Sequence, residues 1–342
     1  MKIKFIICII LMFNLLQNLY CNMQNDSVRY KDEIFDVEVI KDVEYAHVIG
    51  YWDSYPDDSV NAKELMDFVF SEHKKTELDL KMDVYLPKDD TLKKRPLIVF
   101  AHGGAFYIGY KAVSAYREWC SYFASLGYVC VSIDYRLGFP FLTTRNIEKC
   151  EYRAMQDAHA AFRFLVANSE KYGIDTNNIF AAGTSAGSII MLAVAYMKNE
   201  NRLKSTYRGG DCGDIETSGN DYANTFEIKG LANMWGAVYD LSILENNNVP
   251  IISFHGDADK LVPYEKGLMM KTVWGLNLVH KRMYGSSEIT KKAQELGIKA
   301  VINTYPGQGH ALHLDKDKKL NENFYDIQFK IRDFFFDLLS EK

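Results

Sequence analysis

The spacing of apolar and polar residues changes in character near residue 90. Before it, residues 34–39 and 78–86 alternate apolar and polar side chains. A period of two predicts half-exposed antiparallel strands there. After it the apolar runs are continuous, as in strands that are covered on both faces. These runs predict buried strands at 97–101, 128–133, 179–182, 228–235, 249–254 and 299–305.

Helical segments separate these runs, at 116–126, 152–172, 189–195 and 324–339, and residues 61–75 form either a surface helix or a loop. Strands that alternate with helices predict a mostly parallel sheet covered on both faces, which the opening antiparallel strands make mixed. We expect one α/β domain over residues 30–342. Residues 199–227 form a polar, glycine-rich insertion, either a surface loop or a small cap over a pocket.

The N-terminus differs from the rest of the chain. Lys2 and Lys4 precede an apolar stretch over residues 5–16, which is typical of a secretory signal peptide. We therefore expect residues 1–22 to be a signal peptide and the protein to be secreted or periplasmic. A lipid anchor on Cys21 and a retained membrane anchor are the alternatives.

Composition and charge limit the classes of protein to which the chain can belong. The chain is 48% hydrophobic and 25% charged, as in globular proteins with a sizeable core. Its net charge is -5 and it has no basic run, which argues against nucleic acid as a partner. No long apolar segment follows the leader, so a membrane contact is expected only through the N-terminus. In an exported protein, Cys150 and Cys212 are the better pair for a disulfide.

A Gly-x-Ser-x-Gly sequence at residues 183–187 stands between a predicted strand and a predicted helix. This is the context of a nucleophile elbow, in which a tight turn holds the serine hydroxyl outward. Glycines are needed on both sides because the turn leaves no room for side chains. Ser185 is therefore the candidate nucleophile, and the N–H of Ala186 is a candidate donor to a developing oxyanion.

A second glycine turn ends the first buried strand. His102 precedes Gly103 and Gly104 there, the position of an oxyanion loop. We expect N–H donors from Gly104 or Ala105, with Gly103 as a further candidate, and we expect His102 to brace the loop.

Two later strand ends supply a candidate acid and base. Asp257 and Asp259 follow the strand at 249–254, and we favour Asp259 because an aspartate in the position of Asp257 more often shapes the turn. His310 lies between glycine-rich residues after the last strand, where it can swing between serine and aspartate as general base and then acid. His313 is the alternative base, and it lies further from the strand end.

Residues 78–340 resemble α/β-hydrolases of the carboxylesterase and acetyl-esterase type. The segments that carry the resemblance are HGGAF at 102–106, SIDYRLG at 132–138, QDAHAAFRFL at 156–165, YGID at 172–175, GTSAG at 183–187, HGDADKLVP at 255–263 and GQGHA at 307–311. The resemblance implies the α/β-hydrolase fold and a triad of Ser185, Asp259 and His310, with Asp259 as its acid.

These features predict a secreted serine esterase that works through an acyl-enzyme and needs no cofactor or metal. By analogy, its substrates are small-molecule or polysaccharide-linked esters, such as acetyl or feruloyl esters, or small lipid esters. A peptidase or amidase on the same fold is one alternative. A hydrolase-like binding module without catalysis is another, although such modules commonly lack the serine or histidine.

Overall fold

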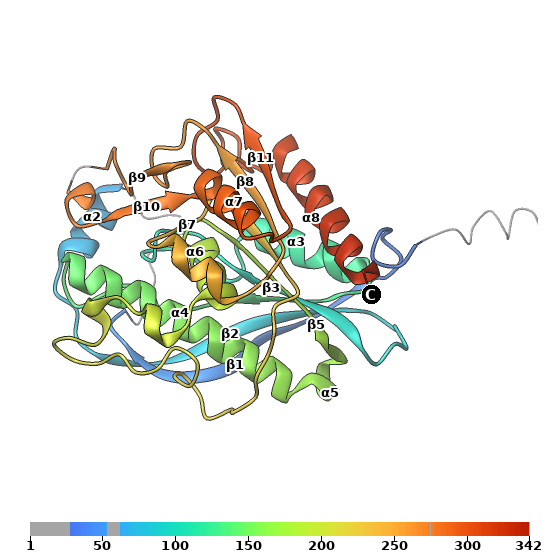
Figure 1. The fold of residues 1–342 in the computed structure, drawn as a ribbon. Coiled ribbons are helices and arrows are strands. Elements are labelled where there is room, and N and C mark those ends of the chain that lie inside the picture. Colours follow the sequence, from blue (N-terminus) through green and yellow to red (C-terminus); the bar gives the residue numbers. More distant parts are fainter. Residues whose placement is uncertain (1–27, 53–61, 274, 342) are drawn as a thin grey trace, which may run out of the picture.

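The computed structural model describes residues 28–52, 62–273 and 275–341. Its centre is a sheet in the order β1-β2-β4-β3-β5-β6-β8-β11 (Figure 1). The strands are β1 (Val37–Gly50), β2 (Thr76–Pro87), β3 (Arg95–Ala101), β4 (Val129–Ile133), β5 (Ile174–Thr184), β6 (Gly230–Met234), β8 (Ile251–Gly256) and β11 (Ala300–Tyr305). β1 and β2 pair antiparallel, β2 pairs antiparallel with β4, and the remaining pairs are parallel. The predicted mixed α/β fold is therefore confirmed.

Helices cover both faces of the sheet. They are α2 (Ala62–Phe70), α3 (Ser114–Ser125), α4 (Thr144–Ala167), α5 (Ser169–Tyr172), α6 (Ala186–Tyr196), α7 (Ser286–Glu295) and α8 (Glu322–Ser340). One core packs α4, α6 and α7 on one face, and a second, rich in aromatic residues, packs α3 and α8 on the other. Since the central strands are buried throughout, their continuous apolar pattern has a direct physical cause.

Some elements differ from the expectation. The helix predicted from residue 152 already begins at Thr144, because the side chain of Thr143 accepts a hydrogen bond from the N–H of Asn146 and caps the helix. A second sheet of β7 (Ala237–Val238), β10 (Arg282–Gly285) and β9 (Lys266–Leu268) was not predicted. Its strands are too short for an alternation of apolar and polar residues to be recognised in the sequence. Four 3-10 helices complete the described elements, at Asn199–Asn201, Lys204–Thr206, Leu241–Asn246 and Leu276–Leu278.

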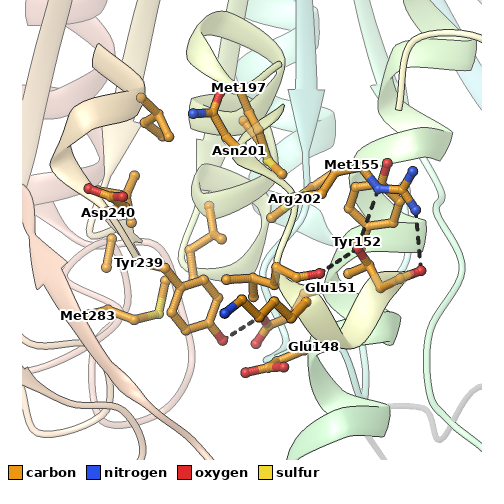
Figure 2. A pocket seen from close by; sticks show the side chains of 18 of the residues that line it. Glu148, Glu151, Tyr152, Met155, Met197, Asn201, Arg202, Tyr239, Asp240 and Met283 are labelled. Carbon is orange, nitrogen blue, oxygen red and sulfur yellow. Dashed lines mark hydrogen bonds between the residues drawn. The ribbon is translucent and has the colours of Figure 1, made fainter. Parts of the chain in front are cut away.

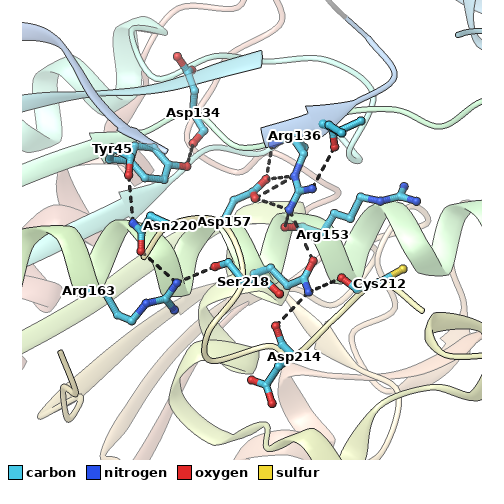
Figure 3. Close-up of polar contacts among 12 residues, drawn as sticks. Tyr45, Asp134, Arg136, Arg153, Asp157, Arg163, Cys212, Asp214, Ser218 and Asn220 are labelled. Carbon is cyan, nitrogen blue, oxygen red and sulfur yellow. Dashed lines mark hydrogen bonds and ion pairs between the residues drawn. The ribbon is translucent and has the colours of Figure 1, made fainter. Parts of the chain in front are cut away.

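The insertion at 199–227 is tied to α4 by side chains of that helix (Figure 3). Lys149, Tyr152, Gln156 and Arg163 each donate hydrogen bonds to backbone carbonyls between residues 209 and 218. Asn220 donates in turn to a carbonyl of α4. The segment is thus held along the helix, and whether it acts as a cap stays a prediction.

Cys150 and Cys212, the better candidate pair for a disulfide, are both free thiols. Cys150 lies on the buried face of α4, where its thiol points toward the carbonyl of Phe106. Burial raises the pKa of Cys150 to about 12, so the thiol is a buried packing group. The predicted leader, residues 1–22, lies outside the described residues. Within the described ranges, no helix has the length and apolarity to cross a membrane.

Candidate active site

Ser185 lies at the turn between β5 and α6. Its backbone has φ 51° and ψ -116°, a conformation that non-glycine residues rarely adopt. A Cβ at Gly187 would lie 2.0 Å from the carbonyl oxygen of Ala101, and one at Gly183 would lie 2.4 Å from backbone atoms of Gly187. The Ser185 N–H donates to the carbonyl of Met234 at 2.9 Å. The glycines are therefore required by backbone contact, as the motif predicts.

The structure brings the three predicted side chains together. Nε2 of His310 lies 2.9 Å from Oγ of Ser185, and Nδ1 of His310 lies 2.6 Å from Oδ2 of Asp259. Because carboxylate oxygens only accept, Nδ1 carries a proton and Nε2 is free to accept the serine proton. This arrangement can activate a serine hydroxyl for attack on a carbonyl carbon.

Asp259 is held in one orientation from several sides. Its side chain is fully buried, and Oδ1 accepts the N–H groups of Leu261 and Val262 at 2.8 and 3.0 Å. Burial raises its pKa, but the hydrogen bonds from His255 and His310 outweigh burial and hold the pKa of Asp259 well below its usual range. The carboxylate therefore stays charged beside His310.

Asp257 and His313, the alternative acid and base, have other contacts. Asp257 accepts the N–H of Gly307 at 2.6 Å, so it shapes the turn that leads to His310. His313 stacks on Trp235 with ring centroids 5.1 Å apart, and burial lowers its pKa to about 3. Within the ranges that the structure describes, no hydrogen bond or ion pair joins His313 to Ser185 or Asp259.

Sequence reasoning missed His255, which contacts the same carboxylate. Its ring is fully buried, and Nε2 lies 3.3 Å from Oδ2 of Asp259 and 3.2 Å from the carbonyl of Val262. Both neighbours are acceptors, so Nε2 carries the proton, and Nδ1 accepts from Oγ of Ser286 at 2.7 Å. Asp259 is thus flanked by two imidazoles. The position of His255, four residues before Asp259 at a strand end, was the available signal.

A buried network continues from His255 back to the elbow helix. Asn233 donates to the hydroxyls of Ser286 and Ser253, both at 3.0 Å. Its carbonyl oxygen accepts from Ser188 at 2.5 Å and from the N–H of Gly236 at 3.0 Å. All four hydrogen-bonding positions of this amide are filled. The network therefore connects Asp259 to α6 behind the site.

The oxyanion loop has the conformation that a backbone donor site needs. Gly104, Ala105 and Phe106 all have positive φ, and a Cβ at Gly104 would lie 1.9 Å from the carbonyl oxygen of Ile108. The N–H of Gly103 already donates to the hydroxyl of Tyr116 at 2.7 Å. Because this N–H is already engaged, Gly103 is not a free donor to an oxyanion, contrary to the expectation. Gly104, Ala105 and Ala186 stay the predicted donors.

Tyr116 and His102 brace this loop. The hydroxyl of Tyr116 also contacts Oγ1 of Thr184, next to the serine, at 2.6 Å. The ring of His102 stacks on Tyr135 with centroids 4.2 Å apart, and its Nδ1 bonds the carbonyl of Gly103 at 2.7 Å. Burial lowers the pKa of His102 to about 4. The imidazole is therefore neutral at pH 7 and acts as a structural brace.

The acidic residues of the insertion stabilise its turns through hydrogen bonds and an ion pair. Asp211 pairs with Arg202, and Oδ1 of Asp214 accepts the N–H groups of Glu216 and Thr217. Across the described ranges, no group of three or more His, Cys, Asp or Glu side chains is placed to hold a metal ion.

Comparison with known proteins gives three kinds of match. The BD-FAE family model matches residues 82–246, which include Ser185 but neither Asp259 nor His310. Esterase LipC of Mycobacterium tuberculosis is 34% identical over 124 residues, which are 36% of this chain and 28% of that protein. Isoprenylcysteine alpha-carbonyl methylesterase ICME of Arabidopsis thaliana is 27% identical over 262 residues, 67% of this chain and 53% of that protein. The chain thus spans between about a quarter and about half the length of these relatives.

Solved structures show a shared fold. Thermogutta terrifontis esterase 2 phosphonylated by cyclosarin has a TM-score of 0.56 at 21% identity, covering 76% of this chain and 90% of that one. The same esterase phosphorylated by paraoxon has a TM-score of 0.56 at 20% identity, covering 90% of this chain and 96% of that one.

Proposed function

We propose that this chain is a serine esterase of the α/β-hydrolase carboxylesterase type, which hydrolyses carboxylic esters through Ser185, His310 and Asp259; its similarity to the BD-FAE family model and to esterases supports the proposal. The observation that carries the proposal is the pair of hydrogen bonds by which one imidazole, that of His310, joins the serine hydroxyl to a buried carboxylate.

The reaction follows from these contacts. Oγ of Ser185 attacks the ester carbonyl carbon while its proton passes to Nε2 of His310, and Asp259 stabilises the imidazolium that forms. N–H groups of Gly104, Ala105 and Ala186 stabilise the oxyanion. His310 then gives its proton to the departing alkoxide, which leaves as the alcohol. Water, deprotonated by His310, cleaves the acyl-enzyme and restores the serine.

For the whole protein we propose export and substrates met outside the cytoplasm. The lysines and apolar stretch of residues 1–22 support export. Acetyl or feruloyl esters of polysaccharide and small lipid esters fit that location. A panel of acyl chain lengths and acylated sugars tests this part of the proposal.

The test of the reaction compares wild type with Ser185→Ala on p-nitrophenyl acetate. We expect turnover to fall at least about a thousandfold, since the nucleophile carries the covalent step. Paraoxon or a fluorophosphonate probe should label the peptide that contains Ser185 in wild type alone. Equal turnover in both proteins contradicts the assignment. Absence of both turnover and label favours a binding module, and cleavage of an aminoacyl anilide in preference to esters favours a peptidase.

A further inference from the structure

A cavity of about 350 Å³ is lined by side chains of α4 and of α6, the helix that follows the proposed nucleophile (Figure 2). Ile189 forms part of its wall and lies one helical turn after Ser185, whose carbonyl accepts the N–H of Ile189 at 3.0 Å. Ala237, also in the wall, comes two residues after Trp235, whose ring centroid is 6.4 Å from that of His310. The segments that carry the reacting groups therefore also form part of the cavity wall.

Most of its wall is apolar and adaptable. Met155 comes from α4, Met197 directly follows α6, Met283 comes from β10, and Ile243 comes from the 3-10 helix after β7. Methionine side chains adjust to the shape of a guest. Ligand cavities of small molecules begin near 300 Å³ and combine such walls with a few placed polar groups. This cavity accordingly suits one short, mainly apolar chain.

Glu151 supplies an unpaired polar group in this wall. The residue is 1% exposed, and its Oε2 accepts a hydrogen bond from the hydroxyl of Tyr239 at 2.6 Å (Figure 2). Its Oε1 is buried and has no hydrogen-bond partner among the described residues. Neighbouring Glu148 differs, because it pairs with Lys281. A buried polar atom without a partner is costly, so a guest that offers one gains binding energy.

The charge state of Glu151 restricts the chemistry of that guest. Burial raises the pKa of Glu151 to about 8, Tyr239 opposes the rise and Glu148 adds to it. At pH 7 the carboxyl therefore keeps a proton. Since Oε2 is engaged by Tyr239, the proton belongs on Oε1, where it can be donated to a guest oxygen.

We propose that this cavity binds the acyl chain of the ester substrate, and that Glu151 selects chains carrying an uncharged oxygen, as a ketone, hydroxyl or ether, beyond an apolar stretch. The inference rests on the proposed esterase function. The acyl group is chosen because it stays on Ser185 in the acyl-enzyme, and Ser185 directly precedes the helix that forms one wall of the cavity. An uncharged group is chosen because a cation would have to be stripped of water and would force a buried carboxyl to ionise.

The experiment measures kcat/KM for matched p-nitrophenyl esters: hexanoate, its 4-oxo and 5-oxo derivatives, and 6-aminohexanoate. In wild type we expect at least one oxo ester to be favoured over hexanoate by about tenfold, the usual worth of a buried hydrogen bond. Glu151→Met should abolish this ratio, and Glu151→Gln, which keeps an N–H donor, should retain most of it. Met155→Leu, an apolar change in the same wall, should leave the ratio unaltered.

Because the readout is a ratio of two substrates, partial loss of folded enzyme does not affect it. If Glu151→Met does not fold, Tyr239→Phe decides, since it removes the hydroxyl that fixes the carboxyl and should reduce the ratio at least about threefold. The inference is overturned if no oxo ester is preferred, if the preference survives Glu151→Met, or if the ammonium ester is the best substrate. These results differ from failure of the proposed function, in which no ester shows turnover that depends on Ser185.

Discussion

Replacing His255 by phenylalanine tests whether the second imidazole on Asp259 matters for turnover. The change keeps a buried ring but removes the N–H that lies 3.3 Å from Oδ2 of Asp259. A hydrogen bond to a charged group contributes about 1.5–3 kcal/mol, and each 1.36 kcal/mol is about a tenfold change in rate. If all of this free energy serves to orient the triad for reaction, losing it lowers kcat by about 10- to 150-fold. KM should change little, because His255 is fully buried behind the carboxylate.

A structural and a positioning role give different results in this assay. His255→Gln places an amide donor near the position of Nε2 and should recover most of the lost kcat. A change that only lowered stability would not be reversed by an amide donor at this position.

His159 offers a matched control. It is buried in α4 against Phe226, with ring centroids 5.6 Å apart, and its Nε2 has no hydrogen-bond partner among the described residues. His159→Phe should leave kcat as in wild type. Wild-type turnover in His255→Phe, or equal losses in His255→Phe and His255→Gln, would refute the reasoning.

Three further predictions concern stability. Burial raises the pKa of Glu151 to about 8 in the folded protein, so unfolding releases its proton between pH of about 4.3 and 8. The free energy of unfolding should therefore fall as pH rises through that window. Urea titrations at several pH values should show a flatter pH dependence in Glu151→Gln than in wild type. Asp157 is fully buried and pairs with Arg136 (Figure 3), so Asp157→Ala should lose about 3–5 kcal/mol in urea unfolding, and a loss under about 1 kcal/mol would contradict this. Gly187→Ala should lower the melting temperature steeply because its Cβ meets backbone at 2.0 Å, whereas Gly309→Ala, with no atom within 4 Å, should not.

Local sequence was sufficient for the parts of the site that depend on backbone shape. Two glycine turns, each after a continuous apolar run, predicted the conformations at Ser185 and Gly104, because those turns exclude side chains. Local sequence could not show that the hydroxyl of Tyr116 accepts a hydrogen bond from the N–H of Gly103. The two residues are thirteen positions apart, and only the packing of α3 brings them together. Cys150 was misassigned for a related reason: its surroundings are polar in sequence, while in space it faces the core.

Long-range polar contacts were hidden for a different reason. His255, Asn233 and Ser286 belong to three separate elements, and each alone is an ordinary polar residue at a strand or helix end. Their role is visible only when their donors and acceptors are counted together, because each satisfies the next. Hydrophobic periodicity contains no information on such a network. Residues of this kind must be found from coordinates.

The loop that carries His310 is more restrained than its glycines suggested. β8 and β11 pair in parallel up to Gly256 and Tyr305, and beyond that point the N–H of Ala258 donates to the carbonyl of Gln308 at 3.0 Å. Asp257 bonds the N–H of Gly307 in the same region. The histidine loop and the acid loop are therefore fastened to each other before either meets the serine. Since orientation is set by backbone pairing, the imidazole need not be positioned anew in each turnover, which favours transition-state stabilisation by groups already in place.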